Sequence, residues 1–94
     1  MEVAFDELAL KDLQFWKNSG NIAIQKKIQK LISNIQESPY TGKGKPELLK
    51  YDLAGTWSRR IDSEHRIVYS VHQNTIQVHS LRGHYNFLNK KKNN

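Results

Sequence analysis

RIVYSVHQNTIQVHSL, residues 66–81, alternates apolar and polar side chains on both sides of a short polar interruption. Alternation with a period of two is typical of a half-buried β-strand, so the stretch predicts strands over residues 66–71 and 75–81. Gln73 and Asn74 lie between them, and asparagine tolerates the positive φ that tight hairpin turns require. The stretch therefore predicts an antiparallel hairpin whose apolar face must be covered by another layer of structure.

The length of that turn also fixes which residues face each other across the hairpin. Paired residues share a face of the sheet, so the register decides which side chains are buried together. The predicted pairs are Val71 with Ile76 and Tyr69 with Val78. The face predicted to be buried carries Ile67, Tyr69, Val71, Ile76 and Val78, and the open face carries Arg66, Ser70, Gln77 and His79.

The preceding residues 57–61, Trp-Ser-Arg-Arg-Ile, predict a third strand of the same sheet. A three-residue loop at 62–64 would place Trp57 on the buried face and set Arg60 opposite Arg66 on the open face. Neighbouring guanidinium groups repel each other unless an anion joins them, and phosphate accepts paired hydrogen bonds from arginine. The register therefore predicts a phosphate-binding site at Arg60 and Arg66.

Other basic and imidazole side chains are predicted to be structural. Alternation points Arg59 to the face opposite Arg60, which favours a structural or peripheral role for it. His65, His72 and His79 show no metal-ligand spacing, and the chain has no cysteine. We therefore predict neither a metal site nor a cofactor.

The N-terminal 40 residues predict a short strand and two helices. Val3 to Phe5 indicates the strand, and helical spacing of apolar residues indicates a helix over residues 7–17. Asp6 is the expected N-cap, because its carboxylate can accept backbone N–H groups, and Gly20 is the expected stop.

A second helix is predicted between Asn21, which can cap it, and Pro39, which ends it. One face of this helix is apolar and the opposite face is polar, so it can cover the apolar face of the sheet. The fold class is therefore α+β, with a small twisted antiparallel sheet packed against an N-terminal two-helix hairpin. The apolar stripe consists of Ile24, Ile28, Leu31, Ile32 and Ile35.

Length and composition bound the domain organisation. The chain has 94 residues, which predicts one domain over residues 1–88 followed by a basic, disordered tail over residues 89–94. No apolar run reaches the length of a membrane-spanning helix, and the first six residues lack the layout of a signal peptide. These features predict a cytoplasmic protein with no membrane association.

Charge is distributed unevenly along the chain. Residues 1–40 hold five basic and five acidic side chains, whereas residues 41–94 hold ten basic and four acidic ones and so carry the whole net charge of +6. Basic stretches interleaved with aromatic residues are typical of proteins that bind nucleic acid. The second half therefore predicts a polyanionic partner.

The basic half also contains the residue types that metal-free RNA cleavage requires. A base must remove the proton of the 2′-hydroxyl group, cations must stabilise the phosphorane, and an acid must protonate the departing 5′-oxygen. Glu47, Arg66 with Arg60, and His84 can supply these groups. Residue types alone are a weak signal, because many basic domains contain them.

Three segments and a residue pair make the signal specific. GKGKPELLK at residues 42–50, LAGTWSRRI at 53–61, EHRIVY at 64–69 and the pair His84-Tyr85 occur in this order. In order and spacing they resemble the YoeB toxins, the Txe/YoeB branch of the RelE/ParE toxin superfamily. The helical half agrees in layout, so the resemblance covers residues 1–85 and implies a RelE-like fold.

The resemblance implies a ribosome-dependent mRNA endoribonuclease from a bacterial toxin–antitoxin pair. By position, Glu47 is the implied general base and His84 the implied general acid, while Arg66 would stabilise the transition state. The implied partners are mRNA on the 70S ribosome, an acidic YefM-type antitoxin and a second copy of the chain.

The resemblance also assigns supporting roles. Lys50 and Arg60 would help to hold phosphate, and Tyr85 would help to position the substrate by contacting a nucleobase. Family members usually end at or just after the His-Tyr pair, whereas this chain continues for nine residues, 86–94. That extension is expected to pack back behind His84, to cover the site or to contact ribosomal RNA. The rival hypotheses are a non-catalytic ParE-like toxin and an RNA-binding module on the same fold.

Overall fold

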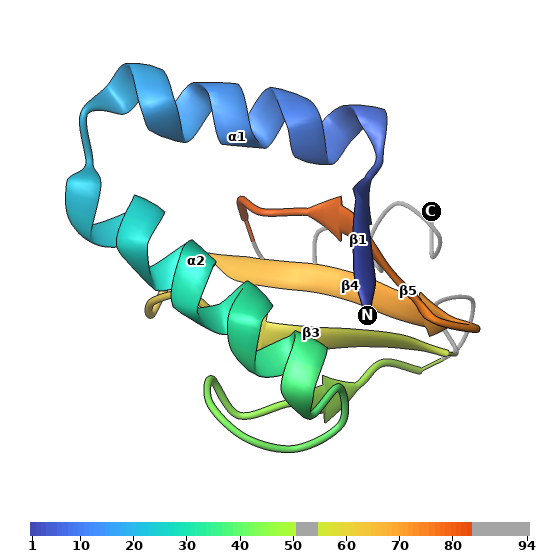
Figure 1. The fold of residues 1–94 in the computed structure, drawn as a ribbon. Coiled ribbons are helices and arrows are strands. Elements are labelled where there is room, and N and C mark those ends of the chain that lie inside the picture. The colour runs from blue at the N-terminus through green and yellow to red at the C-terminus, as the bar shows by residue number, and fades with distance from the viewer. Residues whose placement is uncertain (51–54, 84–94) are drawn as a thin grey trace.

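The computed structural model describes residues 1–50 and 55–83. Two helices cover one face of a five-stranded sheet whose strand order is β1-β5-β4-β3-β2 (Figure 1). β1 pairs with β5 in parallel, and the other neighbouring strands are antiparallel. The elements are β1 (Glu2–Phe5), α1 (Glu7–Ser19), α2 (Ile22–Glu37), β2 (Glu47–Leu48), β3 (Thr56–Arg60), β4 (Arg66–His72) and β5 (Thr75–Ser80).

The predicted register of the central hairpin is confirmed. Tyr69 pairs with Val78 and Val71 pairs with Ile76. The turn differs in one respect, because Gln73 and not Asn74 takes the positive φ, at 56°. Beyond Tyr69 the pairing shifts by one residue, a β-bulge that the alternation of apolar residues did not predict.

The predicted register of β3 is also confirmed. Arg60 pairs with Arg66, and Ile61 N–H donates to His65 O at 2.9 Å across the turn. Asp62 shapes this turn by accepting the N–H groups of Glu64 and His65 at 2.8 and 2.6 Å. Alternation and loop length were therefore sufficient to align β3 and β4 correctly.

The core lies between the sheet and the helices, as the apolar faces predict. Ile67, Tyr69, Ile76 and Val78 are at most 1% exposed, and the partly buried Val71 packs against them. The helices contribute the opposite side of this cluster, with Ala9, Trp16, Ile28, Leu31 and Ile35.

The helix ends agree with the sequence in all but one detail. Gly20 ends α1 with φ 72°, and the Asn21 side chain accepts the Ile24 N–H group at 3.1 Å. Asp6 occupies the N-cap position of α1, but its side chain makes no capping hydrogen bond, so that prediction is wrong. Its carboxylate instead accepts a hydrogen bond from the Gln77 side chain and lies 2.6 Å from His79 Nδ1, which ties the start of α1 to β5.

Two further findings concern the chain as a whole. Within residues 1–50 and 55–83, no helix is long and apolar enough to cross a membrane. The predicted tail, residues 89–94, lies outside the described residues, as do His84 and Tyr85.

Candidate active site

Glu47 and Arg66 meet on the open face of the sheet. They belong to β2 and β4, the two neighbours of β3, and Arg66 Nη1 lies 3.4 Å from Glu47 Oε1. Between them Ser58 of β3 accepts a hydrogen bond from the same Nη1 atom at 3.0 Å. The Arg66 side chain is 8% exposed and that of Glu47 is 47% exposed, so the carboxylate faces solvent above a buried guanidinium group. The structure thus brings the predicted base and the predicted transition-state cation together.

Arg60 and Lys50 lie at the margins of this pair. Arg60 is exposed at the end of β3, opposite Arg66 in the register. Lys50 is exposed two residues after β2. Both ammonium and guanidinium groups are therefore open to a ligand, and phosphate binding by them stays a prediction.

His84 and Tyr85 fall outside the described residues, but the chain is described up to the residue that precedes them. Gly83 O accepts a hydrogen bond from the backbone N–H of Arg66 at 2.9 Å. The peptide that leads into the predicted general acid is therefore fixed directly to the residue that holds Glu47.

The loop before β2 is held by Arg59, which is fully buried on the helix side of the sheet. Its guanidinium group donates to the backbone carbonyls of Ser38, Thr41 and Lys43. It also donates to Asn34 Oδ1 of α2 and, at 3.1 Å from Nε, to Tyr69 OH. The structural role predicted for Arg59 is confirmed, but sequence reasoning missed that it organises the segment leading to Glu47.

Tyr69 completes this loop anchor. Its hydroxyl group donates to Pro39 O at 2.7 Å while it accepts from Arg59. Burial raises the pKa of Tyr69, because a phenolate would be desolvated there, and the hydrogen bond from Arg59 opposes that effect. The phenol therefore stays protonated and keeps its bond to the loop carbonyl.

A second polar cluster lies on the same open face, farther from Arg66 along β4. Ser70 Oγ lies 2.9 Å from His79 Nε2, and His79 Nδ1 lies 2.6 Å from Asp6 Oδ2. The hydrogen bond from His79 lowers the pKa of Asp6, and burial only partly offsets it. This cluster ties the junction of β1 and α1 to β5 and β4, at the edge of the sheet opposite β2.

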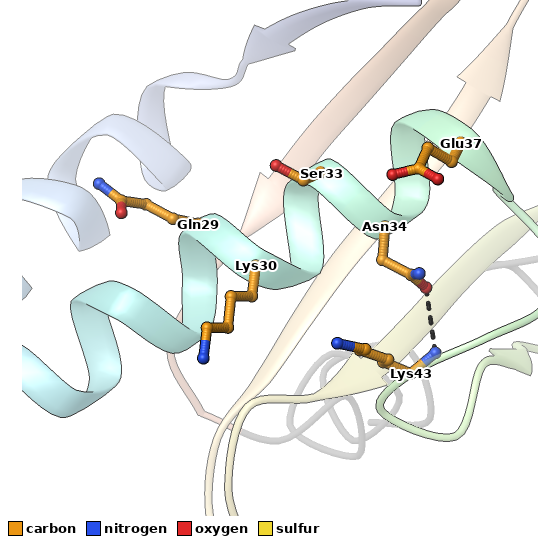
Figure 2. Close-up of a pocket in the computed structure, with 6 residues that line it drawn as sticks. All are labelled: Gln29, Lys30, Ser33, Asn34, Glu37 and Lys43. Atoms are coloured by element: carbon orange, nitrogen blue, oxygen red, sulfur yellow. Dashed lines mark hydrogen bonds between the residues drawn. The ribbon is translucent and has the colours of Figure 1, made fainter.

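The outer side of α2 is hollowed where the loop after α2 approaches the helix (Figure 2). Asn34 accepts the Lys43 backbone N–H at 3.0 Å across this hollow of about 430 Å³. The residues that line this hollow are Gln29, Lys30, Ser33, Asn34, Glu37 and Lys43. Neither Glu47 nor Arg66 is among them, so the hollow is not the candidate site.

The described residues contain no cluster of metal-ligating side chains. In residues 1–50 and 55–83, no three His, Cys, Asp or Glu side chains are grouped so that they could hold a metal ion.

Comparison with known proteins identifies the family of the chain. Residues 5–85 match the family described as the YoeB-like toxin of bacterial type II toxin–antitoxin systems. The chain belongs to the YoeB toxin family. Toxin YoeB of Escherichia coli strain K12 is 41% identical over 85 residues, which are 90% of this chain and 100% of that toxin. Family membership makes the chain a toxin of a type II toxin–antitoxin system, within the RelE/ParE-like superfamily.

Solved structures of the family share the fold. A YoeB/ParE toxin from Agrobacterium tumefaciens matches with a TM-score of 0.86 at 40% identity, covering 90% of this chain and 100% of that one. A YoeB dimer and a YoeB–YefM complex from Staphylococcus aureus each match with a TM-score of 0.82, at 37% and 38% identity. Both cover 90% of this chain and 98% of the other. The two-helix layer on a mainly antiparallel sheet is thus the family fold.

Proposed function

We propose that this chain is an endoribonuclease that cleaves mRNA on the ribosome and thereby inhibits translation. The observation that carries the proposal is the contact of 3.4 Å between Glu47 Oε1 and Arg66 Nη1 on the open face of the sheet. It places a proton acceptor beside a guanidinium group that can hold a phosphate oxygen. A non-catalytic ParE-like toxin or a plain RNA-binding module would need no such acceptor beside a phosphate-binding cation.

The proposed reaction is attack of the 2′-oxygen on the adjacent phosphorus. Glu47 takes the 2′-hydroxyl proton as the 2′-oxygen–phosphorus bond forms, and His84 gives a proton to the 5′-oxygen as the bond from phosphorus to that oxygen breaks. Arg66 stabilises the negative charge that grows on the non-bridging oxygens. The products are a 2′,3′-cyclic phosphate and a 5′-hydroxyl end.

The ribosome is proposed to supply geometry that the chain lacks alone. A carboxylate is a weak base at neutral pH, so its efficiency depends on how well the 2′-hydroxyl group is placed against it. Lys50 and Arg60 would bind neighbouring phosphates, and Tyr85 would stack on a nucleobase of the mRNA. The basic half of the chain favours docking on ribosomal RNA in the bacterial cytoplasm.

Two protein partners are proposed from the relatives. The Staphylococcus aureus structures are described as a YoeB dimer and as a YoeB–YefM complex. We infer that this chain likewise forms a homodimer and binds a YefM-type antitoxin. Its net charge of +6 favours an acidic antitoxin.

The decisive experiment maps mRNA 5′ ends with and without programmed ribosomes. Wild type is compared with Glu47→Gln, Arg66→Ala and His84→Ala, and with Lys11→Ala, whose exposed side chain lies on α1. Wild type and Lys11→Ala should produce new ends only with ribosomes, and each site variant should slow cleavage by about 100-fold or more. If wild type makes no ribosome-dependent ends, the endoribonuclease proposal is wrong and the two rivals remain. A directly formed 3′-hydroxyl end would contradict 2′-oxygen attack.

A further inference from the structure

The backbone of residues 81–83 directly precedes His84. Side chains from distant parts of the chain hold it by hydrogen bonds. At the Leu81 end, Asp12 Oδ2 accepts the Leu81 N–H group at 2.9 Å, and Trp16 Nε1 donates to Leu81 O at 2.9 Å. Asp12 and Trp16 lie one turn apart on α1 and are only 7% and 5% exposed. One helix therefore holds both polar groups of this residue in a water-poor site.

At the other end, Gly83 is held by the turn between β3 and β4. Its N–H group donates to His65 Nδ1 at 2.9 Å, and its carbonyl accepts the Arg66 N–H group at 2.9 Å. A backbone N–H can only donate, so His65 Nδ1 must be unprotonated while it accepts this bond. The imidazole is therefore held in one tautomer, with Nε2 carrying the hydrogen toward Glu64, 3.9 Å away.

The side chains that bind Leu81 and the side chain that binds Gly83 also contact each other. The rings of Trp16 and His65 pack edge to face with centroids 4.9 Å apart and planes at 84°. Arg82 lies between Leu81 and Gly83, and its guanidinium group lies 3.9 Å from the centre of the Phe15 ring, which also belongs to α1. Every residue of 81–83 is thus contacted by a side chain or a backbone group of another element.

We infer that Asp12, Trp16 and His65 are positioning residues for the proposed general acid, because they fix the backbone of residues 81–83, to which His84 is joined. The inference rests on the proposed function, in which His84 is the general acid. A general acid has to lie within hydrogen-bond reach of its target, and a misplacement of about 1 Å can slow a reaction on the order of 100-fold. The hydrogen bond from Arg66 N–H to Gly83 O joins the backbone of residues 81–83 to Arg66, the strand residue that contacts Glu47.

The test uses an mRNA in which sulfur replaces the 5′-bridging oxygen at the cleaved bond, presented on programmed ribosomes. A thiolate leaves without needing a proton, so a defect confined to the general acid disappears on this substrate. The readout is the ratio of the cleavage rates of the sulfur and oxygen substrates. A partly unfolded sample lowers both rates equally, so this ratio does not report on stability.

The variants are chosen to separate an acceptor from mere bulk. His65→Leu removes the acceptor for Gly83 N–H, whereas His65→Asn offers an amide oxygen near the Nδ1 position. His72→Leu is the matched control, because His72 is exposed at the end of β4. We expect His65→Leu and Asp12→Ala to raise the rate ratio about 10- to 100-fold, toward the ratio of His84→Ala. His65→Asn, His72→Leu and the base variant Glu47→Gln should stay near the wild-type ratio.

The outcomes separate this inference from the proposal beneath it. If wild type does not cleave, or if His84→Ala leaves the ratio unchanged, the proposed function or its acid assignment fails. If His84→Ala raises the ratio but His65→Leu and Asp12→Ala do not, the positioning inference alone is overturned. A slow His65→Leu variant that sulfur does not rescue would also overturn it.

Discussion

Arg66 Nη1 lies 3.4 Å from Glu47 Oε1, although the two residues are 19 positions apart and the whole of β3 lies between them. The contact exists because β2 and β4 flank β3 and all their open-face side chains point the same way. A guanidinium group has five N–H donors, so one such group can contact both a carboxylate and a phosphate oxygen. In the proposed reaction this contact sets the distance between the base and the phosphorus that it serves.

Ser58 is predicted to set the aim of Arg66. Its hydroxyl group lies 3.0 Å from Arg66 Nη1, and the residue is fully buried. Ser58→Ala should lower the cleavage rate at saturating ribosomes about 10-fold, because the guanidinium group loses a charge-assisted bond worth about 1.5–3 kcal/mol. Ser63→Ala, in the exposed β3–β4 turn, should cleave like wild type. Equal rates for the two variants would show that Ser58 does not orient Arg66.

Arg59 is predicted to dominate the stability of the loop before β2. Arg59→Met leaves the carbonyls of Ser38, Thr41 and Lys43 without this donor. Loss of such a buried network should cost about 3–5 kcal/mol of the free energy of unfolding, measured by urea denaturation. Arg60→Met is the control for stability, since the adjacent Arg60 is exposed and its loss should change that free energy by less than about 0.5 kcal/mol. Similar losses in both variants would contradict the anchoring role.

Arg59 and Arg60 show which features of the fold can be predicted from the sequence and which cannot. Alternation alone separated Arg59 from Arg60 and assigned each to the correct face, and loop length alone set Arg60 opposite Arg66. Alternation has no information about partners, however. Three acceptors of Arg59 are carbonyls of the loop after α2, which lies beside Arg59 in the fold but not in the sequence.

The same limit explains the other differences. Asp6 stands where a helix cap is expected, but His79 of β5 offers its carboxylate a stronger, charge-assisted partner once β1 has paired with β5. No pattern in the sequence singles out Asp12, yet it is buried and accepts the Leu81 N–H group. Both Asp6 and Asp12 lie more than 60 positions away from these partners, which no local pattern can report.

Tyr69 is predicted to make stability fall at alkaline pH. Burial raises its pKa above the ordinary value of 10.0, so above pH 10 the unfolded chain loses the phenol proton while the folded chain retains it. The free energy of unfolding should therefore decline as pH rises from 9 to 11, and less steeply in Tyr69→Phe. At pH 7 the same variant should be less stable by about 1–3 kcal/mol, because Pro39 O and Arg59 lose their shared partner. Tyr40 is 50% exposed, so Tyr40→Phe is the control at pH 7, where it should be as stable as wild type.

Asp6 is predicted to produce the opposite dependence in acid. Its pKa is lowered in the folded protein, chiefly by the hydrogen bond from His79, relative to an ordinary value of 3.8. Above pH 3.8 both states carry the carboxylate and its contribution to stability is fully present. As the pH falls below that value, the unfolded chain takes up the proton first, so this contribution is lost progressively. Urea denaturation from pH 6 to pH 2 should show a shallower acid decline for Asp6→Asn than for wild type. Parallel curves for Asp6→Asn and wild type would mean that the Asp6–His79 contact adds nothing to the acid stability of the sheet edge.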